Sequence, residues 1–198
     1  MSLEQLKQQY HDCKKCSELC KSRSQVVFGS GNHNSKILFI GEAPGATEDK
    51  QGIPFCGMSG KILSELLAHI GVTRDEVFIT NTILCHPQDN RNPAKEEVQN
   101  CRERLDKMIE IMQPKVIVTI GNFATERILN KTGITTLRGK VYPTIINNKE
   151  VKVVPVIHPA GYLYSGRNPE MLKQMKADFE AIAKVIDDKK QQKSLVEF

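Results

Sequence analysis

The segment KILFIGEAPG, at residues 36–45, indicates how this chain folds. Residues 36–40, KILFI, form a short apolar run that is typical of a strand buried on both faces. The run leads directly into GEAPG, whose two glycines and proline predict a tight turn. In open parallel sheets, ligands bind beside the carboxyl ends of the strands. We therefore expect this loop to border a binding site.

Three more apolar runs, at 77–80, 115–120 and 151–157, predict further strands. Apolar residues at helical spacing predict the intervening helices. These helices cover residues 61–70, 92–112, about ten residues after Gly121, and 168–186. Because strands and helices alternate, the sequence predicts an α/β fold, a three-layer α/β/α sandwich with a central, mostly parallel four-stranded sheet. We expect a single domain over residues 1–187 and a polar tail over 188–198.

Composition and charge limit the class of protein. The 198 residues, 39% of them apolar, suffice for one folded domain. No apolar run approaches the length of a membrane span, and the N-terminal segment MSLEQLKQQYHDC lacks the apolar core of a signal peptide. We therefore expect a cytoplasmic, nucleoid-associated monomer with no membrane partner. The net charge of +5 is compatible with a nucleic-acid partner and does not establish one.

Six cysteines in a cytoplasmic protein favour a metal site over disulfides. Cys13 and Cys16 form a C-x2-C pair; 68 residues separate Cys16 from Cys85, and 15 separate Cys85 from Cys101. Four thiolates can hold either zinc or a four-iron, four-sulfur cluster, and the spacing favours neither. Cys101 is also compatible with an ordinary core cysteine on an apolar helix face. Cys20 is a weaker candidate ligand.

Three polar segments, GEAPG, TN and HPAG, follow predicted strands, so we expect them to meet at one edge of the sheet. The first continues as GEAPGATEDKQGIPFCGMSGKIL from Gly41, and its glycines let backbone amides approach a ligand. GMSGK lacks the spacing of a phosphate-binding P-loop. Cys56, in PFCG, is interpreted as small apolar lining because no basic neighbour would lower its pKa.

Together, GEAPG, the PF-x-G-x-SG-x-IL run, ITN before a cysteine, LRGKVY and VIHPA resemble the family 4 uracil-DNA glycosylases. The resemblance extends from Cys13 to about Arg167. It implies an enzyme that hydrolyses the N-glycosidic bond of deoxyuridine flipped out of uracil-containing DNA, which leaves an abasic site. It also implies that the four cysteines, Cys13, Cys16, Cys85 and Cys101, ligate a [4Fe-4S] cluster.

The resemblance implies roles for residues in the three loops. Phe55 would stack on the flipped uracil, and Asn81 would read the uracil edge through its amide donor and acceptor. His158 would donate a hydrogen bond to uracil O2, where negative charge develops as the bond breaks. Pro159 after it favours an extended backbone at His158.

The first loop supplies two carboxylates and the rest of the pocket lining. Glu42 would position the attacking water or act as the base, and Glu48 would form the wall that excludes the methyl group of thymine. Which glutamate matters more for the rate stays open. The other substrate-binding positions implied are Gly41, Ala43 and Pro44.

The loop HPAGYLYSGRNP would enter the minor groove of DNA. Leu163 would act as an apolar wedge, with Tyr162 or Tyr164 stacking beside it. This loop departs from the shorter leucine–arginine form that is usual in the family. Phosphate contacts would come from four basic residues, Arg91, Arg138, Lys140 and Arg167.

The tail QQKSLVEF fits Q-x-x-L-x-x-F through Gln192, Leu195 and Phe198, which resembles the peptide that docks on sliding clamps. A frayed charged tail is the alternative. Two other functions are alternatives for the whole chain. One is a related glycosylase for other deaminated bases, and the other is a non-catalytic iron–sulfur protein that binds DNA or a clamp. Intact Glu42, Asn81 and His158 argue against the second.

Overall fold

The computed structural model describes the backbone of residues 1–194 and the side chains of residues 1–186. This part of the chain has α/β architecture, as predicted, with a sheet in the order β1-β3-β2-β4-β6-β5. The strands are β1 (Ser30–Gly31), β2 (Ile37–Gly41), β3 (Phe78–Asn81), β4 (Val116–Ile120), β5 (Tyr142–Ile146) and β6 (Lys149–Val156). The α-helices are α1 (Leu3–Tyr10), α2 (Ser17–Ser22), α3 (Ala46–Gln51), α4 (Met58–His69), α5 (Lys95–Met112), α6 (Gly121–Leu129), α7 (Ile134–Leu137), α8 (Pro159–Tyr164) and α9 (Pro169–Ser194).

The sheet is mixed and six-stranded, so the prediction of a four-stranded sheet was wrong. The four central strands, β3, β2, β4 and β6, run parallel, and these are the strands that the apolar runs predicted. At the edges, β1 pairs antiparallel with β3, and β5 pairs antiparallel with β6. β1 has two residues, too few for a pattern. β5 turns into β6 through Asn147 and Asn148, both with positive φ, the backbone that a tight hairpin requires.

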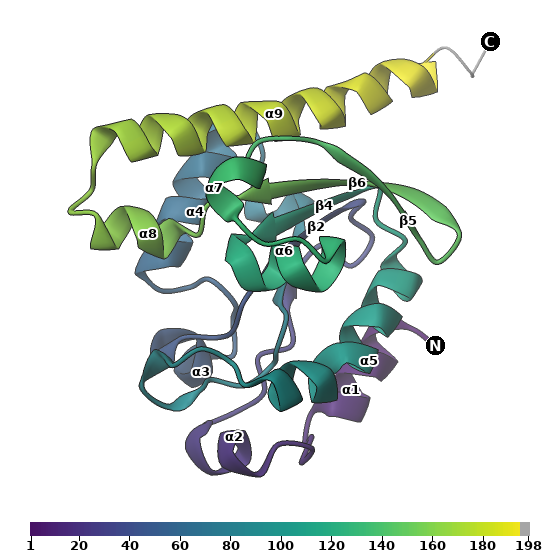
Figure 1. Cartoon of the computed structure of the whole chain (residues 1–198). Coiled ribbons are helices and arrows are strands. Elements are labelled where there is room, and N and C mark those ends of the chain that lie inside the picture. The colour runs from purple at the N-terminus through teal and green to yellow at the C-terminus, as the bar shows by residue number, and fades with distance from the viewer. Residues whose placement is uncertain (195–198) are drawn as a thin grey trace.

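Alternate residues of the central strands point to opposite faces of the sheet and build two separate cores. Leu38 and Ile40 pack with α1, α5 and α6 in what we call the α5-side core. Phe39, between them in sequence, packs with α4 and α9 in the α9-side core. Figure 1 shows α9 along one side of the sheet and α6 and α5 along the other. Because both faces of the sheet are covered by a core, both sets of alternate residues are apolar. This explains why the strands appear in the sequence as continuous apolar runs.

The parallel direction of the four central strands brings their carboxyl ends to one edge of the sheet, where the GEAPG, TN and HPAG segments begin. The register pairs Gly41, the last residue of β2, with Asn81, the last residue of β3. In the described part of the chain, no helix is long and apolar enough to cross a membrane. The clamp-peptide prediction on Gln192, Leu195 and Phe198 falls outside the described side chains and stays a prediction.

Candidate active site

The centre of the site is the space above Gly41. A β-carbon at this position would lie 2.4 Å from Oδ1 of Asn81 and 2.7 Å from two ring carbons of Phe55. The missing side chain therefore lets the Asn81 amide and the Phe55 ring approach the same point from β3 and from the loop after α3. An aromatic face beside an amide edge can hold a flat ring that carries hydrogen-bonding groups.

Asn81 has an acceptor that lacks a partner. Its side chain is 1% exposed, and Oδ1 is buried with no hydrogen-bond partner among the described residues. Its backbone is fixed, because Arg104 donates to the Asn81 carbonyl at 2.7 Å and to the Thr82 carbonyl at 2.9 Å. Leaving a buried polar atom unpaired costs about 1–3 kcal/mol, so a ligand that donates to Oδ1 would recover this cost.

Phe55 is held in a strained backbone conformation. Its φ of 50° lies in the left-handed region, which is unfavourable for a bulky residue. Arg74 holds this turn by donating to the carbonyls of Pro54 at 2.8 Å and Phe55 at 3.1 Å. A β-carbon at Gly60 would lie 1.7 Å from the Phe55 carbonyl oxygen, so only glycine fits there. Such strain is typical of functional sites.

The His158 ring lies beside the Phe55 ring, with ring centroids 5.8 Å apart and planes inclined by 33°. It caps α8, and its Nδ1 accepts a hydrogen bond from the Ala160 amide at 3.1 Å. The neutral ring therefore carries its proton on Nε2, which is free to donate. Burial lowers the pKa of His158 to about 4, although the Glu48 carboxylate opposes this shift.

The two glutamates of the first loop differ in their surroundings. Glu48, on α3, accepts a hydrogen bond from the Gly57 amide at 2.8 Å, which anchors its carboxylate. Glu42, which follows Gly41, is half-buried, and its carboxylate has no hydrogen bond or ion pair within the described part of the chain. Burial raises the pKa of Glu42, so this carboxylate is a stronger base than an ordinary glutamate.

Of the predicted pocket residues, the structure therefore brings Gly41, Phe55, Asn81 and His158 into one group, and Glu48 is close enough to act electrostatically on His158. Pro44 is buried at the start of the same loop. Ala43 is half-buried and packs against the α5-side core.

Two of the basic residues predicted to contact phosphate are engaged elsewhere. Arg138 donates to Asp178 of α9 at 3.0 Å and pairs with its other oxygen at 2.9 Å. Burial raises the pKa of Asp178 to about 6, and Arg138 opposes the shift. Arg91 makes a two-pronged pair with Glu97, at 2.9 and 2.6 Å. Both guanidinium groups thus have internal carboxylate partners, which leaves less of their charge for DNA.

Lys140 and Arg167 make no side-chain hydrogen bond or ion pair with the described residues. These two are therefore the best candidates for the predicted contacts with DNA phosphate. The loop 158–168 also differs from expectation in its apolar residues. Leu163 is half-buried and packs against the α9-side core, whereas Tyr164 is 89% exposed. Because residues 159–164 form a helix, adjacent side chains point in different directions, and Tyr164 is the one that projects outward.

The four cysteines predicted to bind a cluster gather beside the α5-side core. Cys85 and Cys101 are buried in it, and Cys13 and Cys16 pack against it. We call these four the four-cysteine site. All are free thiols. Among the described residues, no group of three or more His, Cys, Asp or Glu side chains is set closely enough to hold a metal ion. Cys20 is turned toward the backbone, with its thiol 3.5 Å from the Cys13 carbonyl oxygen.

Hydrogen-bond donors surround the sulfur atoms of the four-cysteine site. Arg23 donates to Cys85 Sγ at 2.9 Å and to the Cys13 carbonyl at 2.6 Å. Asn100 lies 3.5 Å from Cys16 Sγ. Burial raises the pKa of the Cys85 thiol to about 11, so without a bound metal this sulfur holds its proton. Donors of this kind stabilise thiolates once iron or zinc has displaced the protons.

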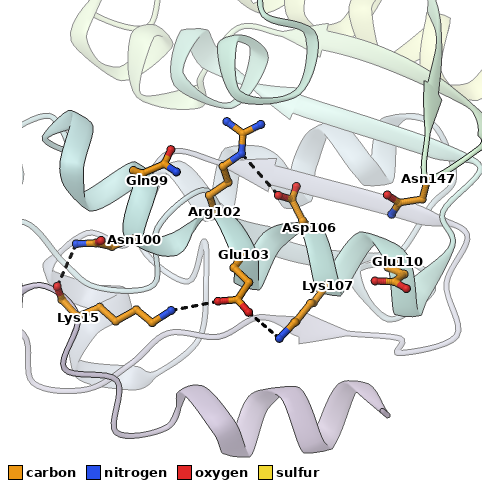
Figure 2. A pocket seen from close by; sticks show the side chains of 9 residues that line it. All are labelled: Lys15, Gln99, Asn100, Arg102, Glu103, Asp106, Lys107, Glu110 and Asn147. Carbon is orange, nitrogen blue, oxygen red and sulfur yellow. Dashed lines mark hydrogen bonds and ion pairs between the residues drawn. The ribbon is translucent and has the colours of Figure 1, made fainter.

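The outer surface of α5 fastens the N-terminal segment in place. Figure 2 shows Lys15 reaching across to Glu103, which also pairs with Lys107, while Asn100 donates to the Lys15 carbonyl at 3.0 Å. Lys15 lies between Cys13 and Cys16, so these contacts hold both cysteines against the helix that carries Cys101. Of the side chains that line the polar hollow in Figure 2, those of Lys15, Asn100, Arg102, Glu103, Asp106 and Lys107 already have partners.

Sequence reasoning missed the residues that position the site rather than touch a ligand, namely Arg23, Gly60, Arg74 and Arg104. Arg104 gave one signal, because it is a charge three residues after Cys101, beside Leu105 on an otherwise apolar helix face. Gly60 lies within the PF-x-G-x-SG-x-IL run but has no local feature that predicts its contact with Phe55. Arg23 and Arg74 carry no such signal.

Comparison with known proteins gives a consistent result. The family described as "Uracil DNA glycosylase superfamily" matches residues 28–180. The chain is 43% identical to the type-4 uracil-DNA glycosylase of Sulfurisphaera tokodaii, over 91% of this chain and 83% of the relative. It is 40% identical to the Archaeoglobus fulgidus protein of the same name, over 95% of each. A third, from Saccharolobus solfataricus, is 37% identical over 95% of this chain and 88% of its own.

The environment of His158 predicts an imidazole that stays neutral far below the usual histidine range. In the free protein, its ring signals in a proton NMR titration should shift with a midpoint near pH 4, because burial lowers its pKa to about 4. The unfolded chain binds this proton at higher pH, so the contribution of His158 to the free energy of unfolding is lost as the pH falls from about 6.5 toward 4. His158→Asn identifies the signals. A midpoint between pH 6 and 7 would contradict the prediction.

Proposed function

The chain belongs to the uracil DNA glycosylase superfamily and to its type-4 enzymes, and from this premise we propose that it hydrolyses the bond between uracil and deoxyribose in DNA. The products are free uracil and an abasic site, the first step of base excision repair. One observation carries this proposal: the buried Oδ1 of Asn81 lacks a partner and faces Phe55 across the missing side chain of Gly41.

Asn81 recognises uracil by complementarity. Its Oδ1 accepts from uracil N3–H and its amide nitrogen donates to O4, while Phe55 stacks on the ring. Cytosine presents the inverse pattern at these atoms and would leave both groups unpaired, at about 1–3 kcal/mol each. A base inside a duplex cannot reach such a pocket, so it is flipped out first. Glu48, fixed by the Gly57 amide, forms the wall that excludes the methyl group of thymine.

His158 acts on the departing base. When the bond between C1′ and N1 breaks, its electron pair stays on uracil and places negative charge on O2. The Nε2–H of the neutral His158 ring donates to this oxygen, and the bond strengthens as the charge develops. The Ala160 amide bonded to Nδ1 holds the required tautomer. A donor that is already neutral also avoids burying a second charge beside the developing anion.

Glu42 acts on the water. Positive charge builds on the sugar as the base leaves, and a carboxylate can stabilise it and orient a water toward C1′. The water adds its hydroxyl to C1′, and its proton passes to Glu42 and then to solvent or the departing uracil. The Glu42 carboxylate has no partner among the described residues, which leaves it available for this role.

We further propose that the four-cysteine site holds a [4Fe-4S] cluster. The soft thiolate set and the donors on sulfur, from Arg23 and Asn100, fit this group. One zinc ion could also use four thiolates, but membership of the type-4 enzymes, which are iron–sulfur proteins, favours a cluster. When bound, the cluster supplies a covalent cross-link between the N-terminal segment, the end of β3 and α5. None of the steps above requires electron transfer to or from the cluster.

The function is tested with a uracil-containing oligonucleotide that is incubated with cluster-replete protein and then treated with alkali. Strand breaks should appear at uracil. Asn81→Leu should lower kcat/KM by about 100-fold or more, because it removes two hydrogen bonds worth about 1–3 kcal/mol each. Asn34→Leu is the matched control, since Asn34 is exposed near the opposite end of β2. No strand breaks with the wild-type protein would refute the proposed function.

Tyr164 rather than Leu163 is expected to fill the gap that a flipped base leaves in the duplex. Tyr164→Ala should slow excision from double-stranded DNA more than from single-stranded DNA, where no pair is opened, and should leave the melting temperature unchanged. Leu163→Ala should lower the melting temperature because Leu163 packs in the α9-side core. Equal losses on both substrates with Tyr164→Ala would argue against the wedge.

The cluster is tested by colour and metal content. Protein purified without oxygen should be brown, absorb at about 400 nm and contain iron and sulfide. Cys85→Ala should lose the absorbance and lower the melting temperature, whereas Cys20→Ala and Cys56→Ala should keep both. Colourless wild-type protein with one zinc ion per chain would decide for zinc.

A further inference from the structure

Arg104 is a buried cation between the two functional regions of the chain. It lies on α5, is 0% exposed and heads the set of largest fully buried side chains. Its guanidinium donates to the carbonyls of Asn81 at 2.7 Å and Thr82 at 2.9 Å, and to Thr80 Oγ1 at 3.3 Å. All three acceptors belong to the end of β3 or the residue after it.

No carboxylate of the described residues lies within ion-pair distance of Arg104. Its Nε–H group is buried without a hydrogen-bond partner in the same part of the chain. Burying a guanidinium in this way is costly unless negative charge is near. Burial lowers the pKa of Arg104, and Cys101 is the group that most strongly opposes this shift. Cys101 lies three residues earlier on the same helix face.

We propose that Arg104 is a positioning residue that couples the four-cysteine site to the end of β3 that recognises the base, with the thiolates of that site supplying its counter-charge. The inference rests on the proposed function for the thiolate state of Cys101 and for the role of Asn81. On this view the cluster serves base recognition electrostatically, besides cross-linking the chain.

The hydrogen bonds around Arg104 extend this effect into the pocket. Beside the carbonyls that Arg104 holds, the Thr82 amide donates to the Gly41 carbonyl at 2.8 Å, and the Ile83 amide donates to the Glu42 carbonyl at 3.1 Å. A shift in the end of β3 would therefore move Asn81, the glycine gap and Glu42 together. Cys85 follows Thr82 and Ile83 in the same segment, so the four-cysteine site also holds the C-terminal end of this segment.

The test compares holoprotein carrying Arg104→Gln or Arg104→Lys with wild type, and uses Arg102→Gln as control because Arg102 is exposed on the same helix. Two readouts do not depend on activity: hydrogen exchange of the Thr82 and Ile83 amides, and the reduction potential of the cluster. Arg104→Gln should speed exchange of both amides about tenfold or more, because two charged hydrogen bonds are lost. It should also shift the potential to more negative values, because a nearby positive charge is gone.

Arg104→Lys keeps the positive charge but loses the planar guanidinium that donates to two carbonyls at once. Hydrogen exchange of the two amides should therefore speed up, while the reduction potential of the cluster stays near that of wild type. Arg102→Gln should change neither. Unchanged exchange or an unchanged potential in Arg104→Gln would overturn the proposal. Should Arg104→Gln fail to fold, Arg104→Lys is the deciding variant. The proposal is contradicted if its Thr82 and Ile83 amides exchange as slowly as in wild type. It is also contradicted if the reduction potential of its cluster becomes more negative, as expected only for loss of charge. Failure of wild-type protein to excise uracil would refute the proposed function alone, since both readouts are made without DNA.

Discussion

The pocket depends on a side chain that is missing. Asn81 Oδ1 and the Phe55 ring both lie within 2.7 Å of the place where a β-carbon of residue 41 would stand. Any side chain there would displace the Asn81 amide or the Phe55 ring, the two groups that we propose bind the base. A second glycine, Gly60, makes the same kind of room for the strained turn at Phe55. The recognition geometry thus follows from two close approaches that only glycine permits.

The sequence predicted the parts of the fold and site that local pattern encodes. The four apolar runs became the parallel strands, and the loops after them meet because parallel strands end at the same edge. Tertiary partners were not encoded in this way. Arg138 was expected on DNA but pairs with Asp178, 40 residues away on α9. Leu163 was expected as the wedge, but residues 159–164 form a helix that turns Leu163 inward and Tyr164 outward.

Desolvation gives the two regions of the chain opposite chemical characters. At the pocket, burial keeps His158 neutral and leaves an amide oxygen without a partner among the described residues, so the site favours the polar, uncharged base that we propose it binds. Beside α5, burial disfavours the charged forms of both Arg104 and Cys85, so each is more stable with an opposite charge nearby. In the holoprotein that we propose, thiolates bound to iron would balance the charge of the guanidinium that bridges to β3, which would tie the four-cysteine site to the order of the pocket.

The two edge strands have a consequence for the behaviour of the protein at high concentration. An open sheet edge is a template on which another molecule can add a strand, and such addition starts aggregation. Here β1 offers only two residues, and β5 carries the exposed Pro143, which has no amide hydrogen to donate to an incoming strand. The antiparallel additions at both ends therefore shield the long parallel strands from intermolecular pairing, and the chain is expected to stay dispersed while it searches DNA.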